Sequence, residues 1–220
     1  MNLIALGDCF GAHRLYSNMF RETHIIRTVT GIDEINRGDV VMFGGGEDIS
    51  PSLYKEKRHQ ITHASDKPSQ RDTFEFLAFQ RAQEFGASCY GICRGAQLLC
   101  ALSGGKLVQH VNNHAGGHFI TTSDGEKMMT SSVHHQMMWP FNLPKDKFEI
   151  LGVSEEPLST IYIFSPEKSL NKVSTEPEIV FFPETRSLGI QGHPEFMHER
   201  SQLVQHSRKL LQHYLMKGEK

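Results

Sequence analysis

The sequence has few cysteines and a single tryptophan among its 220 residues. Three of the four cysteines, Cys89, Cys93 and Cys100, lie within twelve positions, which is too close for disulfides that span loops. They also lack the paired C-x-x-C spacing of a structural zinc site. We therefore expect Cys9, Cys89 and Cys100 to be buried, reduced thiols. Such thiols are typical of the reducing cytoplasm, which is the location we predict.

The chain also lacks an excess of charge of either sign. Its 23 Lys and Arg nearly balance 25 Asp and Glu, and no run of basic residues occurs, so neither nucleic acid nor an anionic membrane is an expected partner. The first eight residues, Met-Asn-Leu-Ile-Ala-Leu-Gly-Asp, show no basic segment and no long apolar stretch, so we expect neither a signal peptide nor a membrane helix. The length suits a single domain over residues 1–220.

Apolar runs alternate with helical patterns in the first half of the chain. Buried strands are predicted at residues 3–6, 25–29, 40–43 and 88–92. Helices are predicted at residues 33–36, after a cap at Thr30; at 70–85, between a cap at Ser69 and a stop at Gly86; and at 96–102. This alternation indicates a parallel sheet with helices on its faces.

The second half has a different character. Short β-like segments at residues 119–122, 127–131, 148–153, 160–164, 179–182 and 188–191 predict some antiparallel strands. Residues 48–68 are polar and predict a loop or lid, residues 165–177 predict an exposed excursion, and residues 197–216 predict a final helix.

The sequence Gly91-Ile92-Cys93-Arg94-Gly95 stands where a predicted strand meets a predicted helix. It is the cysteine counterpart of the G-x-S-x-G nucleophile elbow, in which a sharp corner presents the nucleophile at the carboxyl end of a strand. The helix that begins there places partial positive charge near the sulfur and favours the thiolate. The backbone N–H of Arg94 can donate to an oxyanion.

A candidate base follows a later apolar run, in the sequence Gly192-His193-Pro194-Glu195. Extended chain places residues i and i+2 on one face, and Pro194 favours an extended His193. Glu195 can therefore orient the imidazole of His193 and stabilise its protonated form.

Three glycines, Gly44, Gly45 and Gly46, follow the predicted strand at residues 40–43 and allow close approach of backbone N–H groups to a substrate carbonyl. The nucleophile, the base and the glycine loop each follow the carboxyl end of a strand. A parallel sheet would bring all three to one edge.

Further segments of the chain, in order over about residues 40–200, carry a resemblance to a known family. They are residues 45–54 (Gly-Gly-Glu-Asp-Ile-Ser-Pro-Ser-Leu-Tyr), 71–75 (Arg-Asp-Thr-Phe-Glu), 91–97 (Gly-Ile-Cys-Arg-Gly-Ala-Gln), 104–109 (Gly-Gly-Lys-Leu-Val-Gln), 134–136 (His-His-Gln) and 191–195 (Gln-Gly-His-Pro-Glu). With them the chain resembles the class I glutamine amidotransferases, and more narrowly their γ-glutamyl-γ-aminobutyrate hydrolase branch, peptidase C26.

The resemblance implies a flavodoxin-like α/β three-layer sandwich whose mainly parallel central sheet carries a few antiparallel strands. It implies hydrolysis of a γ-glutamyl amide, or of glutamine, through a thioester, with no cofactor and no metal. The catalytic residues it implies are Cys93, His193 and Glu195. The backbone oxyanion donors it implies are Gly45, Gly46 and Arg94. The residues it implies for binding the glutamyl group are Gln97, His134, His135 and Gln136.

The chain departs from the family pattern in two places: Gly44 replaces a usual proline, and Ser131-Ser132-Val133 replaces a usual Asn-Ser before the His-His-Gln segment. The segment before residue 40 is also short. The leaving amine is not readable from the sequence, and a homodimer stays open.

Three other interpretations are open. One is a glutaminase subunit that delivers ammonia to a separate synthetase. A second is a metal protein, because His110, His114 and His118 recur every four residues. Asparagine and glycine pairs disfavour a helix there, however, and no carboxylate completes a set. The third is an inactive binding module, which the presence of all three catalytic positions disfavours.

Overall fold

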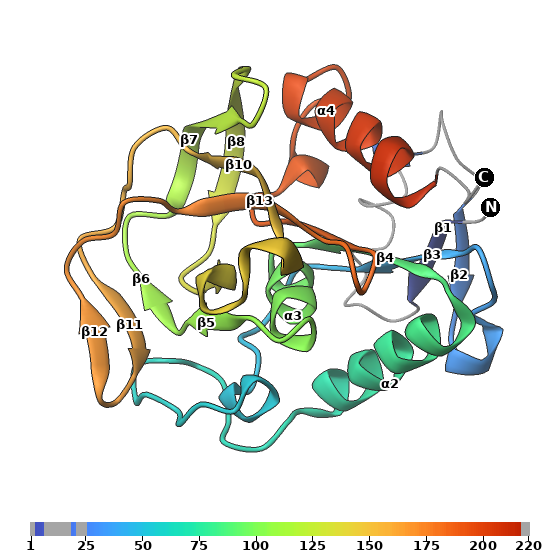
Figure 1. Ribbon diagram of the computed structural model, residues 1–220, viewed down its shortest axis with the longest axis horizontal. Coiled ribbons are helices and arrows are strands. Elements are labelled where there is room, and N and C mark those ends of the chain that lie inside the picture. The colour runs from blue at the N-terminus through green and yellow to red at the C-terminus, as the bar shows by residue number, and fades with distance from the viewer. Residues whose placement is uncertain (1–2, 7–18, 21–25, 217–220) are drawn as a thin grey trace.

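The computed structural model describes residues 3–6, 19–20 and 26–216 (Figure 1). Its main element is a nine-stranded sheet of order β2-β1-β3-β4-β14-β13-β10-β7-β8. The parallel part consists of β2 (Ile26–Val29), β1 (Leu3–Leu6), β3 (Val40–Phe43), β4 (Ser88–Ile92) and β14 (Ser187–Ile190). The antiparallel part adds β13 (Pro177–Phe182), β10 (Glu149–Ser154), β7 (Ala115–Thr122) and β8 (Lys127–Val133).

Helices cover both faces of the parallel part. In Figure 1, α2 (Gln70–Phe85) and α3 (Arg94–Leu102) lie below the strands and α4 (Gln202–Leu210) lies above them. Alternation along β3 shows why: Val41 and Phe43 join the core cluster that contains residues of α2 and α3, whereas Val40 and Met42 join the cluster that contains residues of α4. All four side chains are buried, as expected for a strand covered on two faces. The predicted flavodoxin-like α/β architecture is confirmed.

Helix α2 begins and ends where its sequence predicts. The Ser69 side chain accepts from the backbone N–H of Asp72, and the Asp72 carboxylate accepts from the backbone N–H of Ser69, both at 3.0 Å. This capping box satisfies two N–H groups that the first helical turn leaves without partners. Gly86 ends the helix at φ 67°, a left-handed conformation that glycine adopts without a steric penalty.

Two other predicted helices differ from the structure. The final helix begins at Gln202 instead of residue 197, because Pro194–Phe196 forms a 3-10 turn and the Ser201 side chain caps the backbone N–H of Val204. It continues to Leu215 as a short π-helical turn, Leu211–Leu215. The early helix is a 3-10 turn, Ile32–Glu34, whose cap is the Glu34 side chain and not Thr30.

The second half of the chain holds more short strands than the sequence predicts. β5 (Lys106–Val108) pairs with β9 (Met137–Trp139), and a three-stranded sheet joins β6 (His110–Val111), β11 (Tyr162–Ser165) and β12 (Lys168–Leu170). Strands of two or three residues are too short to show a two-residue alternation. Among the residues that the structure describes, no helix is long and apolar enough to cross a membrane. Cys9 lies outside the described residues.

Gly95 allows a test of how tightly helix α3 packs on β3. A Cβ at this position would lie 2.0 Å from the backbone oxygen of Phe43. Helix propensity alone predicts that Gly95→Ala stabilises the protein by up to ~1 kcal/mol. The contact reverses that sign, and we expect the free energy of unfolding to fall by at least about 2 kcal/mol.

Urea unfolding monitored by circular dichroism measures this change. Gly117→Ala in β7 is the matched control, since its new Cβ would meet no atom closer than 3.2 Å. A Gly95→Ala protein as stable as the Gly117→Ala protein would show that α3 and β3 are packed less closely than described.

Candidate active site

The three motifs that the sequence places at strand ends meet at one edge of the sheet. β4 is hydrogen-bonded to β3 on one side and to β14 on the other, and all three run parallel. Gly44–Gly46 follows β3, Cys93 follows β4, and His193 comes three residues after the end of β14. The carboxyl edge of a parallel sheet is where such folds hold their ligands.

Cys93 occupies the strained corner expected of a nucleophile elbow. Its backbone has φ 50° and ψ −108°, which is unfavourable for a residue with a Cβ, and the corner is the N-cap of α3. The Cys93 N–H donates to the carbonyl of Ile190 at 2.8 Å, which fixes the corner to the end of β14. Glycine is required at position 91, because a Cβ there would lie 2.5 Å from the backbone carbon of Gly95. The Cys93 side chain is only 5% exposed.

The imidazole of His193 lies between the Cys93 sulfur and the Glu195 carboxylate. Its Nδ1 is 2.7 Å from Oε1 of Glu195. Burial alone would lower the pKa of His193, but side-chain interactions with Cys93 and Glu195 outweigh it and raise the pKa to about 10. The Phe196 ring stacks on the imidazole, with ring centres 4.8 Å apart. His193 is therefore held as a cation next to the Cys93 sulfur.

The Arg94 side chain, for which the sequence predicts only a backbone role, anchors α3 to α2. It is fully buried and forms ion pairs with Asp72, at 2.6 Å, and with Glu75. Asp72 also caps α2, so one carboxylate serves both helices. Buried charges of this kind are stable only when they are paired and hydrogen-bonded.

Arg71 connects this network of ion pairs to the glycine loop, residues 44–46. It pairs with Glu75 at 2.9 Å, and its Nη2 donates to the carbonyls of Gly44, at 3.1 Å, and Gly45, at 3.0 Å. Gly46 has φ 147°, and a Cβ there would lie 2.2 Å from Nη1 of Arg71. The loop carbonyls therefore point toward Arg71, and the position of the loop relative to α3 is fixed by charged hydrogen bonds.

The residues expected to bind the glutamyl group lie close together, but their side chains differ in burial and in hydrogen-bond partners. Gln97 is buried and its Nε2 donates to the carbonyl of Gln136 at 2.9 Å. The Gln136 amide accepts from the Ile49 N–H and donates to Thr62, so it holds the loop that follows the glycines. His134 is buried, and burial lowers its pKa well below the usual value, so its Nδ1–H donates to the carbonyl of Gln136.

His135 is different, because its side chain is 41% exposed and pairs with Asp48 at 2.7 Å. The hydrogen bond that the His135 imidazole donates to the Asp48 carboxylate raises the pKa of His135. Asp48 also accepts from the hydroxyl of Thr62 and from the N–H of His63, both at 2.8 Å, which closes the loop predicted at residues 48–68. Sequence patterns assign Asp48 no role of its own, although it lies inside the Gly-Glu-Asp-Ile-Ser-Pro segment.

The fold is that of a class I glutamine amidotransferase-like protein. Over residues 32–153 the chain matches the family model of peptidase C26. That match covers more than half of the sequence, and the chain belongs to the peptidase C26 family.

Similarity to known proteins supports this assignment. A glutamine amidotransferase-like protein of Rickettsia prowazekii is 36% identical over 87 residues, which cover 40% of this chain and 30% of that protein. The matched segment thus spans less than a third of that relative's length. Solved structures that share the fold include a GMP synthase subunit protein of Thermoplasma acidophilum, with a TM-score of 0.59 at 15% identity over 95% of this chain and 91% of that one. A glutamine amidotransferase of Thermotoga maritima gives a TM-score of 0.56 at 15% identity over 96% and 84%.

The environment of the thiols predicts which one reacts. Burial raises the pKa of Cys89 and of Cys100 to about 12, whereas Cys93 lies next to the imidazolium of His193. We expect limiting iodoacetamide at pH 7 to alkylate Cys93 before Cys89 and Cys100, since the thiolate is the nucleophile. Peptide mass spectrometry identifies the modified residue.

His193→Ala is the paired variant, and it should slow the alkylation of Cys93 at least about tenfold, because the cation beside the sulfur is gone. Equal rates for Cys93 with and without the imidazole would contradict the geometry described for this pair.

Proposed function

We propose that the protein is a hydrolase that cleaves the γ-glutamyl amide bond of glutamine or of a γ-glutamyl amine through a thioester on Cys93. The observation that carries this proposal is the imidazole of His193, held between the Cys93 sulfur and the Glu195 carboxylate at the end of adjacent parallel strands. A thiol, a base and a carboxylate that orients the base form the set that nucleophilic acyl transfer requires.

The Cys93 sulfur would attack the amide carbon, and the carbonyl electron pair would move to oxygen. Backbone N–H groups of Arg94 and of Gly45 or Gly46 would stabilise that oxyanion, in positions held by the hydrogen bonds from Arg71 to the glycine loop and by the ion pairs of Arg94. When the C–N bond breaks, His193 would give its proton to the leaving amine. Water would then attack the thioester, transfer a proton to His193, and release glutamate and the thiolate.

The glutamyl group would be bound by Gln97, His134, His135 and Gln136. His134 is a specific candidate because its Nε2 is buried without a hydrogen-bond partner within the part of the chain that the structure describes. A neutral imidazole nitrogen of this kind can accept from the α-ammonium group of a glutamyl substrate. Gln136 would act through the loop that its amide holds.

A glutaminase subunit is the second candidate. The observation that favours it is the structural similarity to a GMP synthase subunit protein over nearly the whole of both chains. In this case the same chemistry would act on glutamine, and ammonia would pass to a separate synthetase. The two candidates differ in their dependence on a partner.

Amine release from a panel of substrates tests the function. We expect the purified protein to hydrolyse at least one γ-glutamyl amide, and Cys93→Ala to lower kcat by a factor of about 10⁶, since the nucleophile is essential. Ammonia and amine assays on glutamine and on substituted γ-glutamyl amides measure this. Circular dichroism of the Cys93→Ala protein shows whether the fold is retained.

Strong turnover of a substituted amide without a partner would favour the hydrolase, whereas weak turnover of glutamine alone would favour the glutaminase subunit. Turnover that survives Cys93→Ala in a folded protein would exclude both.

The raised pKa of His193 predicts an alkaline limit to activity. The proton that His193 gives to the leaving amine is present below its folded-state pKa of about 10 and is lost as the pH rises through that value. The stabilisation that comes from pairing the imidazolium is likewise complete below about pH 6.5, the ordinary pKa of histidine, and is lost on the way to about pH 10. We expect kcat/KM to decline near pH 10.

Glu195→Gln should move this decline to lower pH, because the Glu195 carboxylate is one of the groups that raise the pKa of His193. Rate profiles of both proteins, with circular dichroism at each pH, measure the shift. An alkaline limb at the same pH in the two proteins would show that it does not arise from His193.

A further inference from the structure

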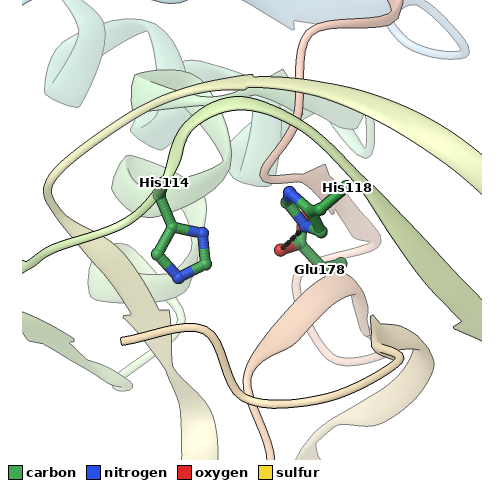
Figure 2. A group of neighbouring side chains, drawn as sticks. All are labelled: His114, His118 and Glu178. Carbon is green, nitrogen blue, oxygen red and sulfur yellow. Dashed lines mark hydrogen bonds and ion pairs between the residues drawn. The ribbon is translucent and has the colours of Figure 1, made fainter. Parts of the chain in front are cut away.

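A cluster of two imidazoles and one carboxylate lies in the antiparallel part of the sheet, next to His134, whose ring stacks on that of His114 with ring centres 4.5 Å apart. It joins His114, directly before β7, His118 within β7, and Glu178 of β13 (Figure 2). The rings of His114 and His118 are in edge-to-face contact, with ring centres 5.5 Å apart. The sequence suggested His110, His114 and His118 as ligands but showed no carboxylate to complete a set. The structure corrects this: Glu178 completes the set, and His110 is not part of it.

Two atoms of the cluster are buried without a hydrogen-bond partner among the described residues: Nδ1 of His114 and Oε2 of Glu178. Both side chains are essentially inaccessible, with His114 2% and Glu178 1% exposed. Figure 2 shows the His114 ring turning its Nδ1 toward the pair formed by His118 and Glu178. Buried polar atoms without partners cost free energy, and a ligand that binds them removes the cost.

The distances suit one cation. Nε2 of His118 and Oε1 of Glu178 are 2.9 Å apart, and one ligand atom from each of the three residues lies within 4.8 Å of the others. Ligand atoms around a tetrahedral zinc ion at about 2.0–2.1 Å are roughly 3.3 Å apart. Binding one ion therefore requires the His114 nitrogen to approach the other two ligand atoms by up to about 1.5 Å, and the His118–Glu178 pair to separate slightly.

The surroundings orient the His114 nitrogen as a metal ligand requires. Its Nε2 lies 3.2 Å from Oε1 of Glu176, which also accepts from the hydroxyl of Tyr162, at 2.7 Å, and from the N–H of Ser159, at 3.0 Å. A carboxylate that accepts Nε2–H leaves the lone pair of His114 on Nδ1, facing the cluster. Histidine ligands of metals are commonly held in this way by a second carboxylate.

We propose that His114, His118 and Glu178 bind one divalent transition-metal ion of the zinc type, with water at the remaining position. Imidazole nitrogens favour zinc over magnesium, which prefers oxygen ligands alone. His118 is the least buried of the three, with a side chain that is 9% exposed. The ion would join β7 to β13, and the carbonyl of Glu178 accepts from the N–H of Gln191, two residues before His193.

Titration of the protein with ZnCl₂ tests this site. Because Cys93 and His193 could themselves bind zinc, the measurements use the full chain carrying Cys93→Ala, freed of metal by a chelator and dialysed. Isothermal titration calorimetry at pH 7 should give one zinc ion per chain. Adding His118→Ala to this protein should weaken zinc binding at least about 100-fold. The loss of a residue that only orients a metal ligand already lowers metal affinity by about 10–100-fold.

His110→Ala is the matched control, because this histidine belongs to the same four-residue series and lies outside the cluster. We expect the zinc affinity of the protein that carries both Cys93→Ala and His110→Ala to stay within about twofold of the zinc affinity of the Cys93→Ala protein. Zinc should raise Tm in the Cys93→Ala and His110→Ala proteins and leave it unchanged in the His118→Ala protein, because an ion that binds only the folded state stabilises it.

Glu178→Gln is a second variant with the same expected loss of binding, and circular dichroism without metal reports whether each variant folds. Failure of the Cys93→Ala protein to bind one zinc ion would overturn the proposal, and so would equal binding in folded His118→Ala or Glu178→Gln. None of these measurements depends on turnover, so the result is independent of the proposed hydrolase activity.

Discussion

The buried ion pairs of Arg94 are the interaction on which the site depends. Arg94 follows the nucleophile directly, so its side chain fixes the start of α3, while its partners Asp72 and Glu75 belong to α2. Through Glu75 and Arg71 the same network reaches the carbonyls of the glycine loop. Leaving one buried charge without its partner costs about 3–5 kcal/mol, so the two helices and the loop keep one relative position.

The relative position of the helices and the loop matters because the strained backbone at Cys93 can move little by itself. Its N–H is bonded to Ile190 and its carbonyl accepts from the N–H of Gln97 at 3.0 Å, so both sides of the corner are held. A backbone at φ 50° with a side chain persists only where its surroundings determine it. The Arg94 network therefore holds the Cys93 corner in register with the glycine loop.

Local patterns were sufficient to predict the elements that carry the site. The capping box at Ser69 and Asp72, the all-apolar β3 and the glycines around Cys93 each encode their conformation within a few residues. The adjacency of Cys93 and His193 followed because parallel strands present their carboxyl ends at one edge.

The side-chain partners of Arg94 could not be predicted in the same way, because they lie 19 and 22 residues away and any exposed carboxylate would have looked equivalent. The same holds for Glu178, which is 60 residues from His118. Both pairings depend on which strands and helices become neighbours, and that order is set by the packing of the whole sheet.

The antiparallel part of the sheet has a direct connection to the edge that carries Cys93 and His193. β13 lies between β14 and β10, and beyond its hydrogen bonds to β14 the Glu178 carbonyl still accepts from the N–H of Gln191 at 2.7 Å. The N–H of His193 donates to the carbonyl of Ser131 in β8, also at 2.7 Å. His193 is thus bonded directly to β8, and Gln191, two residues earlier, is bonded to β13, whereas Cys93 follows a strand of the parallel part. Through these hydrogen bonds, the packing of β8 and β13 contributes to the position of the His193 imidazole relative to the Cys93 sulfur.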